Sequence, residues 1–157
     1  MRLLALVFGI AALDQMSKLC VQMRFLYAEC RTVIPGFFNL HYIRNEGAAW
    51  GMFAGWRLLL ILFSLAMLLL MLIRQRDIFL MQRFGRLALG LLVGGIIGNL
   101  IDRIRLGYVV DFLDFHGGAW HFPAFNVADS AICIGIGLYL LGQFMAERQT
   151  PTAHPSP

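Results

Sequence analysis

Charged residues are scarce in this chain of 157 residues. Asp, Glu, Lys and Arg make up 14% of it and hydrophobic residues 59%, whereas about a quarter of a soluble domain is charged. A water-soluble fold of this size could not bury so much apolar surface. The composition therefore argues against a soluble domain and predicts an integral membrane protein.

Cysteine is also rare, and its spacing gives no sign of a disulfide or metal framework. The three cysteines form no C-x-x-C pair, and two lie in apolar runs, so we expect them to be small buried hydrophobic side chains: Cys20, Cys30 and Cys133. The histidines lack metal-ligand spacing too: His41, His116, His121 and His154. The sequence thus predicts no metal and no other cofactor.

Basic residues give a formal charge of +4, but no cluster of them is typical of a nucleic-acid site. They stand singly or beside apolar runs, where anionic lipid headgroups are the expected partners. We therefore predict a membrane lipid environment and no nucleic-acid partner.

Four apolar segments approach the roughly 20 residues that a bilayer crossing requires. They cover about residues 3–23, 58–73, 87–101 and 127–145. The chain has no room for a second domain, so we predict one membrane domain with four transmembrane helices. The remaining parts are outer loops at 24–57 and 102–126, a cytoplasmic loop at 74–86 and a disordered tail at about 149–157.

The short stretch 74–86 contains four arginines and one acid. Because cytoplasmic loops carry an excess of Lys and Arg, this density places the loop and both chain termini in the cytoplasm. The other two loops together also carry six basic residues. The predicted orientation therefore depends on how closely the arginines follow one another in the short loop, and not on the total number of basic residues.

Both outer loops contain β-prone stretches. Residues 37–43 partly alternate apolar and polar side chains after the turn signal Pro35-Gly36, and residues 108–115 are similarly β-prone. The predicted fold class is therefore an all-α membrane bundle with a small β-platform on its outer face. Small residues at four-residue spacing also predict close packing of segments three and four: Gly90, Gly94 and Gly98, then Ala131 and Gly135.

Polar residues within or beside the apolar segments need an explanation, because charge is costly in a membrane unless it faces protein or water. Asp14 and Lys18 share one helix face and fit either a structural ion pair or a substrate contact. Asn99, Asp102 and Arg103 end the third segment, as a helix exit or as part of a functional site.

The last segment opens with Asn126 and Asp129, whose spacing fits both a helix N-cap and a functional pair. In the preceding loop, Asp111 and Asp114 compete as candidates. Asp111 is favoured because apolar residues flank it on both sides, but the sequence leaves the choice open.

The common nucleophile motifs G-x-S-x-G, H-E-x-x-H and S-x-x-K are absent. Carboxylates remain as the candidates for chemistry. Two carboxylates that share a proton can activate a water and protonate a carbonyl oxygen without a cofactor.

Four sequence blocks, read together, carry a resemblance. They are D-Q-M-S-K at 14–18, N-E-G-A-A-W-G at 45–51, G-G-I-I-G-N-L-I-D-R at 94–103, and V-D-F at 110–112 with F-P-A-F-N-V-A-D-S at 122–130. In this order they resemble the bacterial lipoprotein signal peptidase, or type II signal peptidase, family. Departures are Trp50, where a phenylalanine-type aromatic is usual, and the loop 115–122.

The resemblance implies an aspartic endopeptidase of the bacterial inner membrane. It would remove the signal peptide of prolipoproteins by cutting before a cysteine that carries diacylglycerol, near the outer face of the membrane. It implies an outer β-platform and a short outer helix, and it agrees with cytoplasmic termini. The catalytic pair would be Asp111 and Asp129, with neither assigned as acid or base. The substrate-binding residues would be Asn45, Asn99, Arg103 and Asn126, and the supporting residues Asp14, Lys18, Gly47 and Asp102.

Two other classes compete with this reading. A small membrane transporter or scaffold would use buried acids to move protons or bind an ion. A lipid-headgroup transferase would use several Asp residues with a divalent metal and would lose activity on chelation.

Overall fold

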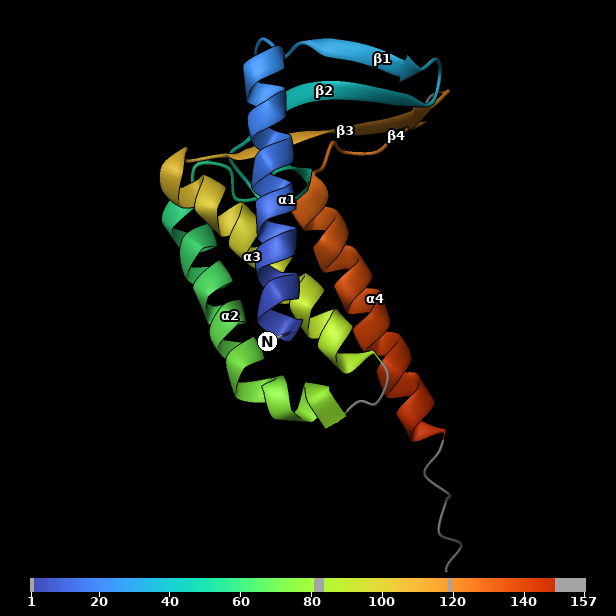
Figure 1. Ribbon diagram of the computed structural model, residues 1–157. Coiled ribbons are helices and arrows are strands. Elements are labelled where there is room, and N and C mark those ends of the chain that lie inside the picture. The colour runs from blue at the N-terminus through green and yellow to red at the C-terminus, as the bar shows by residue number, and fades with distance from the viewer. Residues whose placement is uncertain (1, 81–83, 119, 149–157) are drawn as a thin grey trace, which may run out of the picture.

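Four long helices form the body of the molecule (Figure 1). The structure is a computed structural model, and it describes residues 2–80, 84–118 and 120–148. Each helix is long and apolar enough to cross a membrane: α1 (Arg2–Arg24), α2 (Arg57–Leu80), α3 (Gly85–Arg105) and α4 (Val127–Glu147).

Four antiparallel strands lie across one end of the bundle, in the order β1-β2-β3-β4 (Figure 1). They are β1 (Cys30–Ile34), β2 (Phe38–Asn45), β3 (Val109–Gly117) and β4 (Trp120–His121). The predicted fold class, four apolar helices with a small sheet, is therefore confirmed. A short 3₁₀ segment, η1 (Ala49–Gly51), follows β2; the resemblance implied a short outer helix but did not place it.

Helix α2 runs past its predicted end. We expected a span at 58–73 followed by a loop, but the helix continues to Leu80. Residues 74–80 contain no Gly or Pro that would stop a helix, so apolar patterning located the span but not the helix end. The predicted disordered tail at about 149–157 lies outside the described residues.

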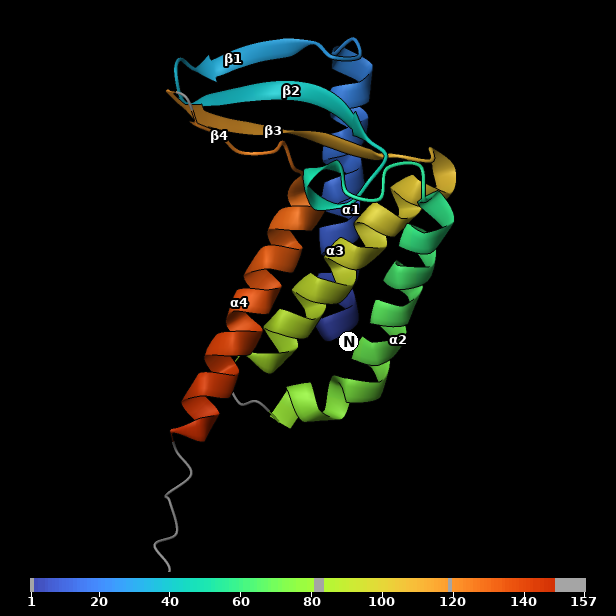
Figure 2. The same cartoon turned by 180° about the vertical axis from the view of Figure 1, so that it is seen from behind.

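Helix α3 lies at the centre of the bundle and packs against the other three helices (Figure 2). In its span 56% of the residues are buried within the protein, compared with 6% in the span of α2. The glycines of α3 allow close contact with two neighbouring helices. A Cβ atom on Gly94 would lie 2.8 Å from Cβ of Ile10 in α1. A Cβ atom on Gly95 would lie 2.5 Å from the carbonyl oxygen of Ala128 in α4. Helices α3 and α4 are in contact as predicted, but the predicted glycine face is turned mainly toward α1: Cβ atoms on Gly90 and Gly98 would also meet side chains of α1.

We expect Gly95→Ala to destabilise the protein by about 1–3 kcal/mol, because the added methyl group would force α3 and α4 apart. Gly9→Ala is the matched control, since a Cβ atom there would meet nothing within 4 Å. Alanine at that helical position is expected to be neutral or to stabilise by up to about 1 kcal/mol. Unfolding midpoints in detergent measure both variants, and equal midpoints would contradict this account of the α3–α4 contact.

The sheet is fixed to the bundle by an apolar cluster that joins α1 to β2 and β3. Val21, Tyr42, Val110 and Phe112 are buried against one another. A hydrogen bond also joins the start of α2 to the end of α3. Nε of Arg57 donates to the carbonyl oxygen of Arg103 over 2.8 Å. These contacts hold β3 in place directly after α3.

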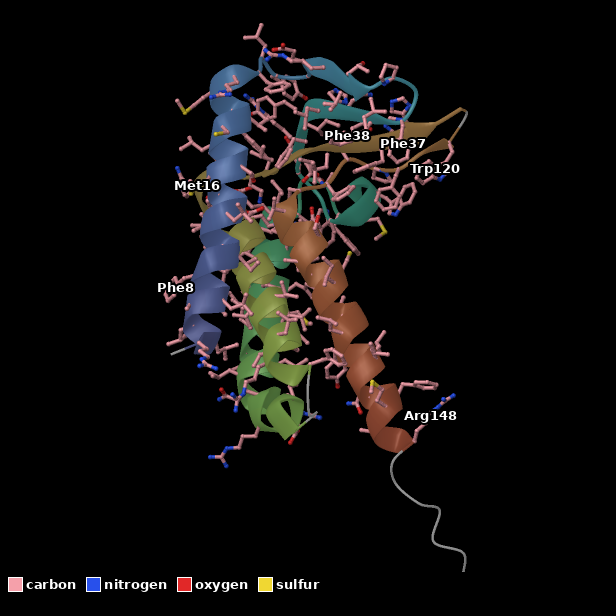
Figure 3. All side chains as sticks on the ribbon, turned by 45° about the vertical axis from the view of Figure 1, so that its right-hand side comes forward. Phe8, Met16, Phe37, Phe38, Trp120 and Arg148 are labelled. Atoms are coloured by element: carbon pink, nitrogen blue, oxygen red, sulfur yellow. The ribbon has the colours of Figure 1, made fainter. Side chains whose placement is uncertain are left out.

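The cysteine prediction was wrong. Cys20, Cys30 and Cys133 are all exposed and free. Figure 3 shows the reason on α1, where Phe8 and Met16 point away from the bundle. An apolar segment of a membrane protein can turn its side chains toward lipid, so location in such a segment does not predict burial in protein.

Candidate active site

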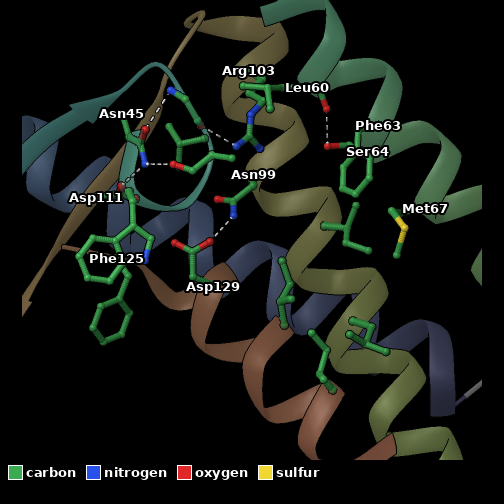
Figure 4. Close-up of a pocket in the computed structure, with 18 of the residues that line it drawn as sticks. Asn45, Leu60, Phe63, Ser64, Met67, Asn99, Arg103, Asp111, Phe125 and Asp129 are labelled. Atoms are coloured by element: carbon green, nitrogen blue, oxygen red, sulfur yellow. Dashed lines mark hydrogen bonds between the residues drawn. The ribbon is translucent and has the colours of Figure 1, made fainter. Parts of the chain in front are cut away.

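A cavity of about 1350 Å³ lies beneath the sheet and extends down between the helices (Figure 4). Six of the residues predicted from the sequence line it: Asn45, Gly47, Asn99, Arg103, Asp111 and Asp129. Asn126, predicted to bind substrate, is fully buried and is not among the lining residues. The apolar wall of the cavity comes from α2, α3 and α4, with Phe63, Met67 and Ile136 among the lining residues. Polar groups from distant parts of the chain therefore meet at one end of an apolar chamber.

Asp111 projects from β3 into this cavity, and its side chain is buried. Its Oδ2 accepts a hydrogen bond of 2.9 Å from Nδ2 of Asn45, and its Oδ1 accepts one of 2.7 Å from Nδ2 of Asn126. Asp114 is three residues further along the same strand, so it points to the opposite face of the sheet. There Nδ2 of Asn39 donates to it over 3.1 Å. Of the two aspartates that the sequence left in competition, Asp111 is the one that lines the cavity.

The environment of Asp111 favours its protonated form. Burial, and then the negative charge of Asp129, raise the pKa of Asp111 from about 3.8 to about 7. The hydrogen bonds from Asn45 and Asn126 stabilise the carboxylate and act in the opposite direction. Near neutral pH, Asp111 can therefore either hold or release a proton.

Asp129 is held at the start of α4 by a capping box with Asn126. The backbone N–H of Asp129 donates to Oδ1 of Asn126 over 2.9 Å, and the backbone N–H of Asn126 donates to Oδ2 of Asp129 over 3.2 Å. The other oxygen of Asp129 accepts a hydrogen bond of 2.7 Å from Nδ2 of Asn99. The N-cap reading is confirmed, and the same Asn126 also donates to Asp111, so one residue contacts both acids.

Asn99 is oriented by a buried cation. Its Oδ1 accepts hydrogen bonds from Nζ of Lys18 at 2.9 Å and from Nδ2 of Asn126 at 3.3 Å. Because both contacts are donors, the amide NH₂ must turn toward Asp129. Lys18 therefore acts on Asp129 through Asn99, without lining the cavity itself.

Lys18 lies between two acids, with Nζ 2.7 Å from Asp14 and 2.9 Å from Asp102. All three side chains are buried. The backbone N–H of Ala128 also donates to Asp14, and that of Val110 donates to Asp102. Of the two alternatives for Asp14 and Lys18, the structure contains the ion pair. Together with the two backbone hydrogen bonds, it joins α1 and α3 to the start of α4 and to β3.

Arg103 is one of the cationic residues that line the cavity. Its Nη2 donates to the carbonyl oxygen of Gly47 over 3.2 Å, while its Nε is buried without a hydrogen-bond partner in the described part of the chain. The N–H of Gly47 donates to Oδ1 of Asn45 over 2.9 Å. A Cβ atom at Gly47 would lie 2.5 Å from the carbonyl oxygen of Met52, so only glycine fits this tight loop.

Comparison with known proteins shows the family of this chain. A family model described as signal peptidase (SPase) II matches residues 6–145. The chain belongs to the signal peptidase II family. The lipoprotein signal peptidase of Syntrophotalea carbinolica is 44% identical to it over 149 residues, with 90% of each chain covered. That of Desulforapulum autotrophicum is 48% identical over 139 residues, covering 83% of this chain and 84% of the relative.

Solved structures are similar as well. One described as a bacterial membrane enzyme matches with a TM-score of 0.84 at 28% identity, covering 99% of this chain and 94% of the other. A second bacterial membrane enzyme matches with a TM-score of 0.77 at 30% identity, covering 90% and 92%. The resemblance stated from the four sequence blocks is therefore confirmed, and this signal peptidase II family member is a multi-pass membrane protease.

Sequence reasoning did not single out Gln15 in this signal peptidase II family member. Its Nε2 donates to Oδ1 of Asp102 over 2.9 Å and to the carbonyl oxygen of Gly98 over 3.1 Å. The available signal was its place in the first block, beside Asp14. Asp102 itself points toward Lys18 and away from the cavity, so it supports the neighbouring groups rather than lining the site.

Proposed function

We propose that this signal peptidase II family member is an aspartic endopeptidase that cleaves the signal peptide from prolipoproteins before a lipidated cysteine. The observation that carries the proposal is the pair Asp111 and Asp129 in one cavity, coupled through Asn126 and Asn99. The raised pKa of Asp111 lets this member of the pair hold a proton near neutral pH. The transporter and scaffold alternative does not account for the family membership.

The proposed reaction uses the two acids as base and acid. The ionised carboxylate takes a proton from a water whose oxygen attacks the scissile carbonyl carbon, while the protonated carboxyl gives its proton to the carbonyl oxygen. The tetrahedral intermediate then collapses: the C–N bond breaks, the leaving nitrogen takes the proton that the first carboxylate accepted from water, and a hydroxyl of the intermediate returns its proton to the other carboxylate. The residues need no metal for this cycle.

The chamber suits a lipidated peptide. Its apolar wall can take the apolar signal segment and the acyl chains, because both lose contact with water there. At the polar end, the guanidinium of Arg103 and the amides of Asn45 and Asn99 are donors that can orient the peptide carbonyls. Orientation holds the scissile bond beside the carboxylate pair.

Cleavage is proposed to occur near the outer face of the bacterial inner membrane, with both termini cytoplasmic. Arg74 and Arg76 lie in the last part of α2, at the end of the bundle away from the sheet (Figure 1). The positive-inside rule assigns that end to the cytoplasm. The sheet and the carboxylate pair then lie on the opposite side, where exported precursors arrive.

The test is cleavage by the purified full chain of a precursor peptide with and without diacylglycerol on its cysteine. We expect cleavage of the lipidated precursor immediately before the modified cysteine, and unchanged activity after treatment with EDTA. Loss of activity on chelation with recovery on metal addition would contradict the aspartic mechanism. Absence of cleavage under verified conditions would contradict peptidase function altogether.

We expect kcat/KM to fall as the pH rises through about 7. The raised pKa means that folded Asp111 keeps its proton below about pH 7 and loses it above, which leaves both carboxyl groups of the pair ionised and neither able to act as the acid. A pH profile of kcat/KM at saturating detergent and fixed salt measures this. A profile that stays level from about pH 6 to 9 would show that no proton on this pair is required.

A further inference from the structure

Three potential metal ligands meet on the face of the sheet opposite the cavity. Cys30 of β1 pairs in register with His41 of β2, and Asp114 of β3 pairs with Asn39, two residues from His41. One ligand atom from each of the three side chains, Sγ, an imidazole nitrogen and a carboxylate oxygen, lies within 4.8 Å of the other two. We propose that Cys30, His41 and Asp114 form a binding site for a divalent transition-metal ion of the Zn²⁺ type.

The donor set selects the class of metal. A thiolate and an imidazole suit Zn²⁺ and its neighbours, whereas Mg²⁺ and Ca²⁺ prefer oxygen ligands alone. In a tetrahedral site with bonds of about 2.0–2.3 Å, ligand atoms lie about 3.3–3.6 Å apart. Small side-chain rotations therefore suffice to bring the three donors onto one ion, and a water completes the fourth position.

Asp114 provides an independent reason for a cation here. Its side chain is 1% exposed, and in the described part of the chain no Lys or Arg forms an ion pair with it. The nearest basic group is the exposed imidazole of His121, with Nε2 2.8 Å from Oδ1. A buried carboxylate with so little compensation is costly, and a bound cation would offset that cost.

Asn39 is placed to support the bound ion. Its Nδ2 donates to Oδ2 of Asp114 over 3.1 Å, which fixes the carboxylate as supporting residues commonly fix metal ligands. Its Oδ1 is buried and accepts no hydrogen bond from any of the residues that the structure describes. A metal-bound water could donate to that oxygen, so the ion would satisfy a group that is otherwise unpaired.

The bound ion would join β1, β2 and β3 through one side chain from each, in addition to the backbone hydrogen bonds of the sheet and the hydrogen bond from Asn39 to Asp114. On binding, the Cys30 thiol gives up its proton to solvent, because the thiolate is the ligand. The site does not rest on the proposed peptidase function, since Asp111 faces the other side of β3. Its predicted effect is on the stability of the sheet.

Titration of the purified full chain with Co²⁺ tests the site, because a thiolate bound to Co²⁺ gives a ligand-to-metal charge-transfer absorption. We expect one Co²⁺ per chain, displaced by Zn²⁺. Cys30→Ser should abolish the absorption band, and His41→Ala or Asp114→Asn should weaken binding at least tenfold. Cys20→Ser and Cys133→Ser are the matched controls and should keep the band.

A second measurement separates binding from misfolding. Zn²⁺ should raise the Tm of the wild-type chain and leave that of Cys30→Ser unchanged, while both have similar Tm values in EDTA. Asp111→Asn should bind Co²⁺ as the wild type does, whether or not it cleaves precursor. A band that persists in Cys30→Ser, or a wild-type chain without a band at millimolar Co²⁺, would overturn the proposal.

Discussion

Asp111→Asn and Asp129→Asn are each expected to reduce cleavage of a lipidated precursor by about a thousandfold or more. Asparagine has nearly the same shape as aspartate, but it can neither take a proton from water nor give one to the scissile carbonyl, and such proton transfers contribute about 10²–10⁴-fold each. The measurement is kcat/KM for the purified variants with the same lipidated precursor.

The two variants should differ in how they disturb the site. The carboxylate of Asp111 accepts hydrogen bonds from two side-chain amides, so an asparagine there must turn its own NH₂ group toward a donor. Yet the same change removes a buried group whose charged form is disfavoured. We therefore expect a small change in stability and a large loss of activity at this position.

Asp114→Asn is the matched control, because it replaces an equally buried aspartate on the opposite face of the same strand. Cleavage should persist in this variant when the assay is run in EDTA. Full cleavage by either Asp111→Asn or Asp129→Asn would refute the catalytic pair. Loss confined to Asp114→Asn would move the active site to the other face of the sheet.

Lys18→Met is expected to lower the free energy of unfolding by about 3–5 kcal/mol. Removing the cation leaves two buried carboxylates, Asp14 and Asp102, without their partner, and breaking a buried charge network in this way is costly. Methionine keeps most of the side-chain volume, so the effect comes from charge rather than from a cavity. Unfolding midpoints in detergent measure the loss.

Arg31→Met is the control for this change. Arg31 pairs with Glu29 at 2.7 Å, but its side chain is 53% exposed, and exposed pairs contribute at most about 1 kcal/mol. Lys18→Met should also reduce kcat, because Asn99 loses the donor that turns its NH₂ toward Asp129. Equal stability of the two variants would show that the buried network contributes no more than a surface pair.

The sequence predicted most of the polar residues that meet at the candidate site, but few of the contacts between them. Polar groups in an apolar chain stand out because their burial has to be compensated, which singled out Asp14, Lys18, Asn99 and Asp129. Their partners could not be read from the sequence, because hydrogen bonds such as Lys18 to Asn99 join residues far apart in the chain. The catalytic roles of Asp111 and Asp129 stay predictions until the variants are measured.

By itself, the sequence determined the membrane class, the four apolar helices and the two main strands of the sheet. These follow from composition and from local periodicity, which short stretches of chain carry. The tertiary structure decided that Asp111 and not Asp114 enters the cavity, that the α3 glycines pack on both α1 and α4, and that Cys30, His41 and Asp114 meet. Strand register and helix packing fix these contacts, and both depend on residues distant in sequence.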